Sequence, residues 1–229
     1  MENEIETANE TTAQPQRTLT PARLKVDGLV FLFSLAVLGL CSLPIDANHV
    51  GGLEVTVFEA INGLPDFIYP AVWVVMQLGN IVIVPITAVV AVLFRRYKLA
   101  TGILFSGFFV WILAKVVKDL VPRGRPGQLL EDVILQGDTP MTGRGFVSGH
   151  AAVVAAIAAI LTPYLGTKGR WVVWTLVALT ATARVYVGAH LPLDSVGGVA
   201  LGVAGGTLAL VILDVIPGNL TGRPHSKTT

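Results

Sequence analysis

The sequence predicts an all-α membrane protein, a six-transmembrane helical bundle with an additional helix at the outer interface. Composition is the first observation: 53% of the 229 residues are hydrophobic and 14% are charged, whereas a soluble domain has about 25% charged residues. The second is that the apolar residues gather in stretches long enough to cross a bilayer, which takes about 20 helical residues. We therefore expect lipid to surround most of the chain.

The chain divides into a polar tail at 1–26, a six-span domain at 27–217 and a second tail at 218–229. The first tail has too few apolar side chains to fold alone, so we expect it to be disordered. Its acidic start, and the lack of a small-residue cleavage site after the first apolar stretch, argue against a cleaved signal peptide. The single cysteine, Cys41, excludes an internal disulfide.

Six apolar stretches account for the predicted spans. They are residues 28–44, 68–94, 99–117, 148–166, 171–189 and 193–216.

Two of the connections are long. Within 45–67, Leu53, Val57 and Phe58 recur at helical spacing, with Glu54 off that face, which indicates a short amphipathic helix on the outer interface. A capping loop over the bundle is the alternative. Residues 118–147 are rich in Gly and Pro, so we expect them to be mostly loop.

Basic residues gather before the first stretch, in every second connection and after the last stretch. They are Arg17, Arg23, Lys25, Arg95, Arg96, Lys98, Lys168, Arg170, Arg223 and Lys227. The positive-inside bias then predicts a multi-pass protein of the cell membrane with both termini in the cytoplasm. The connections 45–67, 118–147 and 190–192 are expected to face outward.

Three basic residues, Lys118, Arg123 and Arg125, follow the third stretch on this outer side. Lysine offers a mobile point charge and arginine a planar fork, and both suit phosphate oxygens. The alternative is that these long side chains only snorkel to the interface. An excess of basic residues on the outer side opposes the positive-inside bias, which favours anion binding.

The fourth stretch opens with Ser148, Gly149 and His150. Serine is a natural N-cap, and glycine lets a ligand approach the backbone. The free N–H groups and the dipole of a helix start attract anions. Taken alone, the segment is better explained by a capped helix with an interfacial histidine.

Charged residues also surround the turn between the last two stretches. Arg184 lies inside the fifth stretch, where an arginine costs several kcal/mol unless it is paired or hydrated. We expect it to face the bundle interior. Pro192 suits the first turn of the next helix, so Asp194 is expected to reach one imidazole nitrogen of His190 and leave the other free to attack. The alternative is a capping carboxylate beside an interfacial histidine.

Together these segments resemble the signature of the type 2 phosphatidic acid phosphatase superfamily, the membrane relatives of vanadium haloperoxidases. The family pattern is Lys-x6-Arg-Pro, then Pro-Ser-Gly-His, then Ser-Arg-x5-His-x3-Asp. The first motif is complete from Lys118 to Pro126, whereas Val147 replaces a proline in the second and Ala183 a serine in the third. Order and spacing match over about residues 28–216. The two departures concern loop stiffness and one auxiliary hydroxyl.

The resemblance implies a phosphatase that acts on lipid phosphates through a phosphohistidine. His190 would be the nucleophile, Asp194 would orient it, and His150 would protonate the leaving group. The residues that would hold the phosphoryl oxygens are Lys118, Arg125, Ser148, Gly149 and Arg184. We expect no metal and no cofactor, because positioning and charge stabilisation carry most of phosphoryl transfer.

The expected partners are membrane lipids and a lipid phosphate or diphosphate, such as phosphatidate, phosphatidylglycerophosphate or a polyprenyl diphosphate; no nucleic-acid partner is expected. An outward site fits recycling of a polyprenyl diphosphate carrier. The rival functions are a transporter or channel, a vanadate-dependent haloperoxidase, and an inactive family member that only binds lipid phosphate. Gln77 and Asn80 are the best candidates for a transport pathway, but we expect them to form interhelical hydrogen bonds.

Overall fold

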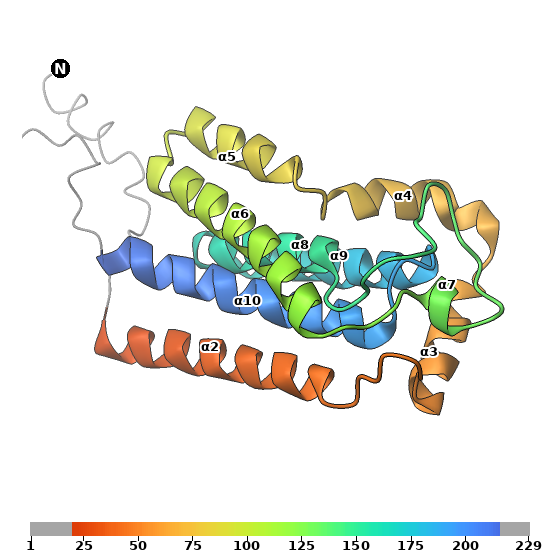
Figure 1. Ribbon diagram of the computed structural model, residues 1–229. Coiled ribbons are helices and arrows are strands. Elements are labelled where there is room, and N and C mark those ends of the chain that lie inside the picture. Colours follow the sequence, from red (N-terminus) through yellow and green to blue (C-terminus); the bar gives the residue numbers. More distant parts are fainter. Residues whose placement is uncertain (1–19, 216–229) are drawn as a thin grey trace, which may run out of the picture.

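A computed structural model describes residues 20–215 of the chain, and this part is all-helical, without a β-strand. Its elements, in order, are α2 (Pro21–Ser42), α3 (Gly52–Asn62), the short 3-10 helix η2 (Asp66–Ile68), α4 (Tyr69–Gln77), α5 (Ile83–Leu93), α6 (Tyr97–Leu120), α7 (Pro126–Leu129), α8 (Gly149–Leu161), η3 (Thr162–Tyr164), α9 (Thr167–Tyr186) and α10 (Pro192–Val215). The long helices form a bundle, and α3 and α7 lie at one end of it (Figure 1).

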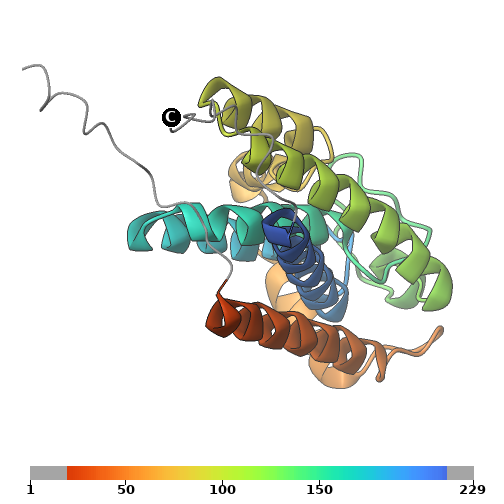
Figure 2. The ribbon, with the colours of Figure 1, turned by 90° about the vertical axis from the view of Figure 1, so that its left-hand side faces the viewer.

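Helix α10 is the centre of this bundle. It packs against α8, α2, α6 and α9, and it lies between them when the bundle is seen from one end (Figure 2). Of the three long apolar helices it is also the most buried, whereas α2 is the least. The core therefore surrounds α10, and α2 lies at the periphery.

The contact between α8 and α10 depends on three glycines at four-residue spacing, Gly198, Gly202 and Gly206. A Cβ atom at any of them would lie closer than 3.0 Å to a carbonyl oxygen of α8 or of its N-cap residue, Ser148. Small residues at this spacing let two helix backbones approach closely. Helix α8 is itself rich in alanine, and its residues 151–160 are all buried. The two helices whose N-termini carry the second and third motifs are thus held backbone to backbone.

Several helices begin or end where the sequence did not predict. Thr20 caps α2 by accepting the Arg23 N–H at 3.3 Å, so the first turns of α2 occupy residues 21–26, and the prediction that these residues are disordered is wrong. The other predicted tail residues, 1–19 and 218–229, lie outside the described part. Helix α9 ends at Tyr186 because Gly188 adopts a φ of +74°, a conformation that favours glycine.

The stretch 68–94 is two helices rather than one, because the chain turns between α4 and α5. At this turn the Asn80 side chain accepts the Val82 N–H at 3.1 Å, and its amide lies 3.5 Å from the Gln77 side-chain oxygen. Both polar residues therefore form hydrogen bonds within their own turn, and the prediction of interhelical bonds is wrong. Gly79 makes the turn fit: a Cβ there would be 2.6 Å from the His150 carbonyl oxygen.

Three helices of the described part, α2, α6 and α10, are long and apolar enough to cross a membrane. Helix α5 and the segment from α8 to η3 are apolar but shorter. The membrane fold is therefore supported, while the count of six crossings remains a prediction.

The predicted helix in the first outer connection is present as α3. Its Phe58 is buried, and the Asn62 amide donates to the carbonyl oxygens of Ile134 and Tyr186, both at 2.8 Å. These contacts tie α3 to the loop after α7 and to the last turn of α9.

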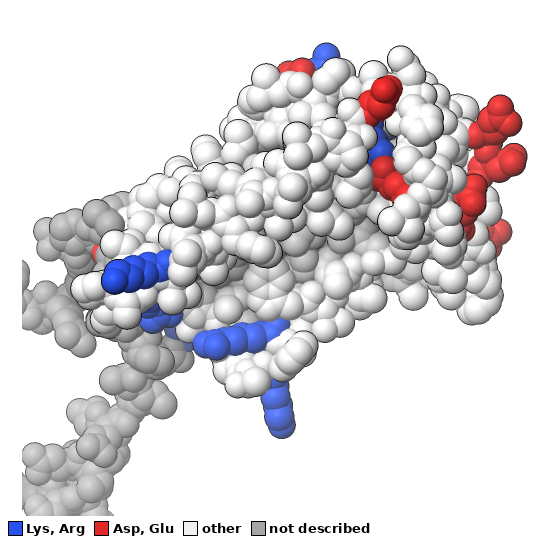
Figure 3. All heavy atoms as spheres, turned by 90° about the horizontal axis from the view of Figure 1, so that it is seen from below, with Lys and Arg blue, Asp and Glu red and all other residues white. Residues whose placement is uncertain are grey.

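On one face of the described bundle, most exposed basic and acidic side chains lie toward opposite ends. Lys and Arg side chains gather toward one end of the face shown in Figure 3, and most of its Asp and Glu side chains toward the other. The α5–α6 and α8–α9 connections, which carry Arg95, Arg96, Lys98, Lys168 and Arg170, lie at the end opposite α3 and α7 (Figure 1). These are the basic residues from which the sequence predicts the cytoplasmic side.

Candidate active site

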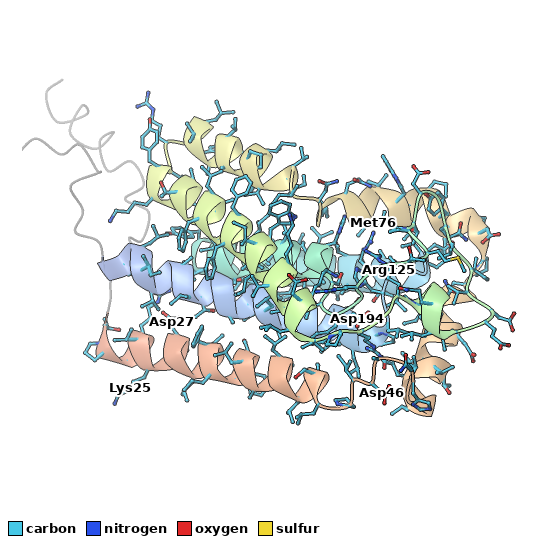
Figure 4. All side chains as sticks on the ribbon, viewed as in Figure 1. Lys25, Asp27, Asp46, Met76, Arg125 and Asp194 are labelled. Carbon is cyan, nitrogen blue, oxygen red and sulfur yellow. The ribbon has the colours of Figure 1, made fainter. Side chains whose placement is uncertain are left out.

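The structure brings the three motifs together at the α3 end of the bundle. Lys118 lies in the last turn of α6 and Arg184 in the last turn of α9, while Asp194 lies in the first turn of α10. Arg125 comes from the loop before α7, and its side chain lies at the same end as Asp194 (Figure 4). Every residue that the sequence predicted for the site is at this end.

Lys118 is held by the loop that carries the second motif. Its ammonium group donates to the carbonyl oxygens of Arg144 and Gly145, both at 3.0 Å. The Gly145 N–H in turn donates to the Arg123 carbonyl oxygen at 2.7 Å. An ammonium group has three donors, so these contacts orient Lys118 and leave one N–H for a ligand.

The start of α8 is built as predicted. Ser148 is the N-cap, and its hydroxyl accepts the Ala151 N–H at 3.5 Å. The Ser148 N–H donates to the backbone oxygen of Asp194 at 2.8 Å, which fixes the start of α8 against the start of α10. Next to it, a Cβ atom on Gly149 would meet no atom within 4 Å. Open space therefore adjoins a helix N-terminus with free N–H groups.

Two arginines of the site lack a carboxylate partner. Arg184 is 8% exposed, and one terminal nitrogen lies 2.8 Å from the Met76 sulfur. Arg125 donates to the Ala189 carbonyl oxygen at 3.1 Å. Within the described residues, the Nε atoms of both arginines are buried without a hydrogen-bond partner, as is that of Arg123, so what distinguishes the two is the lack of a carboxylate. Burial lowers the pKa of Arg125, against the opposing effect of Asp194.

His190 is buried beside Asp194, but the predicted hydrogen bond between them is absent. The His190 Nδ1 atom lies 3.6 Å from Oδ2 of Asp194, too far for a hydrogen bond. This oxygen instead accepts the Leu191 N–H at 2.9 Å. Burial, with the charges of Arg184, Lys118 and Arg125, holds the pKa of His190 well below its usual range. The imidazole is therefore neutral at physiological pH.

His150 is half-buried in the first turn of α8. It lies within electrostatic range of His190 and of Arg184, Arg125 and Lys118. Two imidazoles thus share one group of three cations, which is an arrangement suited to binding and transferring an anionic group.

Glu54 was not predicted for the site. Arg123 was predicted, with Lys118 and Arg125, as a candidate for anion binding, but it pairs with carboxylates of the protein instead. Arg123 is 2% exposed and donates to Asp194 Oδ1 at 3.0 Å, and it also pairs with Glu54 of α3. Its place in the same basic segment as Lys118 and Arg125 was the available signal. No sequence pattern connects Glu54 with Arg123, which are 69 residues apart.

Comparison with known proteins identifies these features. The family model described as the PAP2 superfamily matches residues 97–216, more than half of the chain. An undecaprenyl-diphosphatase of Sulfolobus acidocaldarius is 32% identical over 122 residues, which cover 52% of this chain and 57% of that protein. The chain therefore aligns with little more than half the length of this relative.

Two further proteins extend the similarity. An Escherichia coli protein named "Putative undecaprenyl-diphosphatase YbjG" is 27% identical over 185 residues, 76% of this chain and 89% of its own. The crystal structure of Aquifex aeolicus LpxE superposes with a TM-score of 0.67 at 23% identity, covering 72% of this chain and 99% of that chain. At this low identity, the similarity to LpxE shows a shared fold. With its three motif segments gathered at one site and the family model matched over residues 97–216, the chain belongs to the PAP2 superfamily.

Proposed function

We propose that this protein is an integral membrane phosphatase that removes phosphate from a lipid phosphate or diphosphate. The observation that carries the proposal is the group formed by Lys118, Arg125 and Arg184 beside two imidazoles. Arg184 is buried, and Lys118 and Arg125 are half-buried. Asp194 acts on Lys118 and Arg125 through its charge, but it is already paired with Arg123. Buried cations without counter-ions are costly, and a phosphate or diphosphate group supplies the missing negative charge.

The proposed reaction has two steps. Because Nδ1 of His190 faces Asp194, its Nε2 attacks phosphorus: an N–P bond forms while the P–O bond to the leaving group breaks. His150, which takes up a proton when the anionic lipid phosphate binds beside it, gives this proton to the leaving oxygen. Water then attacks the phosphohistidine, His150 takes a proton from that water, and phosphate leaves with His190 restored.

The remaining site residues bind the phosphoryl oxygens. The three cations compensate their charge, and the open space at Gly149 lets an oxygen reach the first N–H groups of α8. The Ser148 hydroxyl accepts the Ala151 N–H, which leaves its own proton for a phosphate oxygen. No metal or cofactor has a role in this scheme.

A polyprenyl diphosphate is the proposed substrate class, ahead of phosphatidate and phosphatidylglycerophosphate. Two relatives carry names of undecaprenyl-diphosphatases, and a site at one end of the apolar bundle suits a lipid whose headgroup lies at the membrane surface. Membrane lipids are the other proposed partners.

The proposed arrangement in the cell membrane has six crossings within a domain at 27–217. Helices α4 and α5 together make one of them, and the site faces outward. The basic connections 95–98 and 168–170 support cytoplasmic termini. Cysteines introduced at positions 10 and 135 should label oppositely in intact cells, and labelling of position 10 from outside would overturn this orientation.

The function is tested with purified protein in vesicles that contain polyprenyl diphosphate, phosphatidate or phosphatidylglycerophosphate. We expect release of inorganic phosphate, fastest from the polyprenyl diphosphate, and inhibition by vanadate, which mimics pentacoordinate phosphorus. Binding of these lipids without phosphate release would indicate an inactive family member. Movement of solute across the vesicle membrane without phosphate release would indicate a transporter.

A further inference from the structure

Glu54 of α3 makes a set of buried contacts that the proposed reaction does not use. Its side chain is 9% exposed, and both of its oxygens contact the Arg123 guanidinium. Oxygen Oε1 also accepts the Leu193 N–H at 2.9 Å, in the first turn of α10. Glu59 on the same helix is exposed, so burial singles out Glu54 among the two acidic residues of α3.

Arg123 joins Glu54 to the proposed catalytic pair. One of its terminal nitrogens lies 3.1 Å from Glu54 Oε1 and 3.0 Å from Asp194 Oδ1. Asp194 presents its other oxygen to Nδ1 of His190. The side chains of Glu54, Arg123, Asp194 and His190 therefore form a continuous buried row from α3 to the proposed nucleophile.

The charges of this row have a direct consequence for His190. Two carboxylates share one guanidinium, so the row carries one net negative charge. When the imidazole is phosphorylated it gains positive character, and the uncompensated carboxylate charge stabilises it. Without the charge of Glu54, Arg123 would neutralise Asp194 alone, and His190 would face only the surrounding cations.

We propose that Glu54 is a positioning residue for catalysis, which by binding Arg123 keeps Asp194 aligned and its charge available to His190. This inference rests on the proposed phosphatase activity. Glu54 lies outside residues 97–216, the segment that the family model matches, and its role follows from the contacts of α3 in this structure.

The direct test compares Glu54→Gln with Glu59→Gln, the same chemical change at an exposed position of the same helix. Glutamine keeps the size of Glu54 and an oxygen for the Leu193 N–H but removes the charge. We expect Glu54→Gln to lower kcat by about 10- to 100-fold, as for loss of a group that supports a directly acting residue, with KM little changed. Glu59→Gln should match the wild type, and Glu54→Asp should recover part of the rate.

A pH profile separates this role from general structural support. His190 is surrounded by charged or titratable groups from five elements. They are Lys118 of α6, Arg125 of the following loop, His150 of α8, Arg184 of α9 and Asp194 of α10. Removing a negative charge from this environment lowers the pKa of His190 further. The acid limb of kcat/KM should therefore move to lower pH in Glu54→Gln, whereas a loosened structure would lower the rate without moving the limb.

A double-mutant cycle tests whether Glu54 acts through Asp194. In an Asp194→Asn background, Glu54→Gln should have less than about a threefold effect, because the residue on which it acts is already disabled. Wild-type rates in Glu54→Gln, or full additivity with Asp194→Asn, would overturn the inference while leaving the phosphatase itself intact. An inactive wild-type protein would instead overturn the proposed function.

Discussion

Two buried arginines of the site have opposite surroundings. Arg123 is 2% exposed and pairs with two carboxylates, Glu54 and Asp194. Arg184 is 8% exposed, and its contact is with the sulfur of Met76. Both are removed from water, so the cost of burying the charge applies to both. The structure compensates the first internally and leaves the second for an external anion.

This difference divides the site into two halves that meet at His190. In the half around Arg123, the charge of the guanidinium is saturated by Glu54 and Asp194, and Asp194 faces the imidazole. The half around Arg184, with Lys118 and Arg125, holds unused N–H groups and is suited to bind the phosphoryl oxygens. A buried cation is thus informative about ligand binding only when its partners inside the protein are known.

The largest expected effect comes from His190, where the two halves meet. His190→Ala should abolish the acid-labile phosphoenzyme and reduce turnover by about 10⁴-fold or more, the scale of losing a nucleophile. His49, exposed at the same end of the molecule, provides the matched control, and His49→Ala should retain wild-type activity. Phosphate release and trapped ³²P-labelled protein measure both. A phosphoenzyme that survives His190→Ala but is lost in His150→Ala would reverse the two roles.

Substitution of the two arginines tests the comparison itself. Arg184→Gln should lower kcat/KM by about 10²–10³, as for loss of a donor to the transition state, without lowering the melting temperature in detergent. Arg123→Gln leaves two buried carboxylates unpaired, which costs about 3–5 kcal/mol when a buried pair is broken, and should lower the melting temperature.

Thermal unfolding and steady-state kinetics, measured on the same preparations of both variants, show which variant loses stability and which loses activity. A large loss of stability in Arg184→Gln, with none in Arg123→Gln, would show that the division into a saturated and an unsaturated half is wrong.

A smaller effect is expected from pH. The neutral form of His190 is the nucleophile, and its pKa is lowered by burial and by three cations. Protonation of His190 then begins only below the ordinary imidazole value of about 6.5, so kcat/KM should not fall as pH decreases from 7 through that value. Because phosphate groups also titrate, the profile should be recorded with two lipid substrates of different pKa. An acid limb of kcat/KM that lies above pH 6.5 and is the same for both lipid substrates would contradict the lowered pKa of His190.

The smallest expected effect is that of a chelator. Lys118, Arg125 and Arg184 supply the positive charge that a metal ion would bring to phosphoryl transfer. Phosphate release in excess EDTA should therefore stay within about twofold of the untreated rate. Complete loss in EDTA with recovery in magnesium would show that the unpaired cations are not sufficient.

The sequence predicted the long helices better than their interruptions. Long apolar stretches identified α2, α6 and α10, since hydrophobic length is a strong signal for a membrane helix. The turn between α4 and α5 was missed because Gly79 and Asn80 are only two residues within a run of apolar ones. Its reason is the close approach of Gly79 to the backbone of His150, a tertiary contact without a local pattern.

In the site, too, the residues that depend on tertiary contacts could not be predicted from the sequence. The motif residues Lys118, Arg125, His150, Arg184 and His190 were predictable because their types and spacing together match the signature of a known family. Glu54 was not, because an acidic residue on an amphipathic helix is ordinarily a solvated one. Its role depends on how α3 docks through Phe58 and Asn62, which only the three-dimensional structure provides.

The glycine-lined contact of α8 with α10 has a consequence for how such an enzyme can diversify. A single methyl group at Gly198, Gly202 or Gly206 would collide with the opposite backbone, so this interface cannot be retuned in small steps. Helix α2 has most of its side chains turned outward and is the least buried of the long helices. Adaptation to a lipid tail of another length or branching is therefore open on the peripheral helices, while the spacing of the two imidazoles stays the same. A library that varies α2 and preserves the three glycines should change which lipids are accepted without changing how phosphate is released.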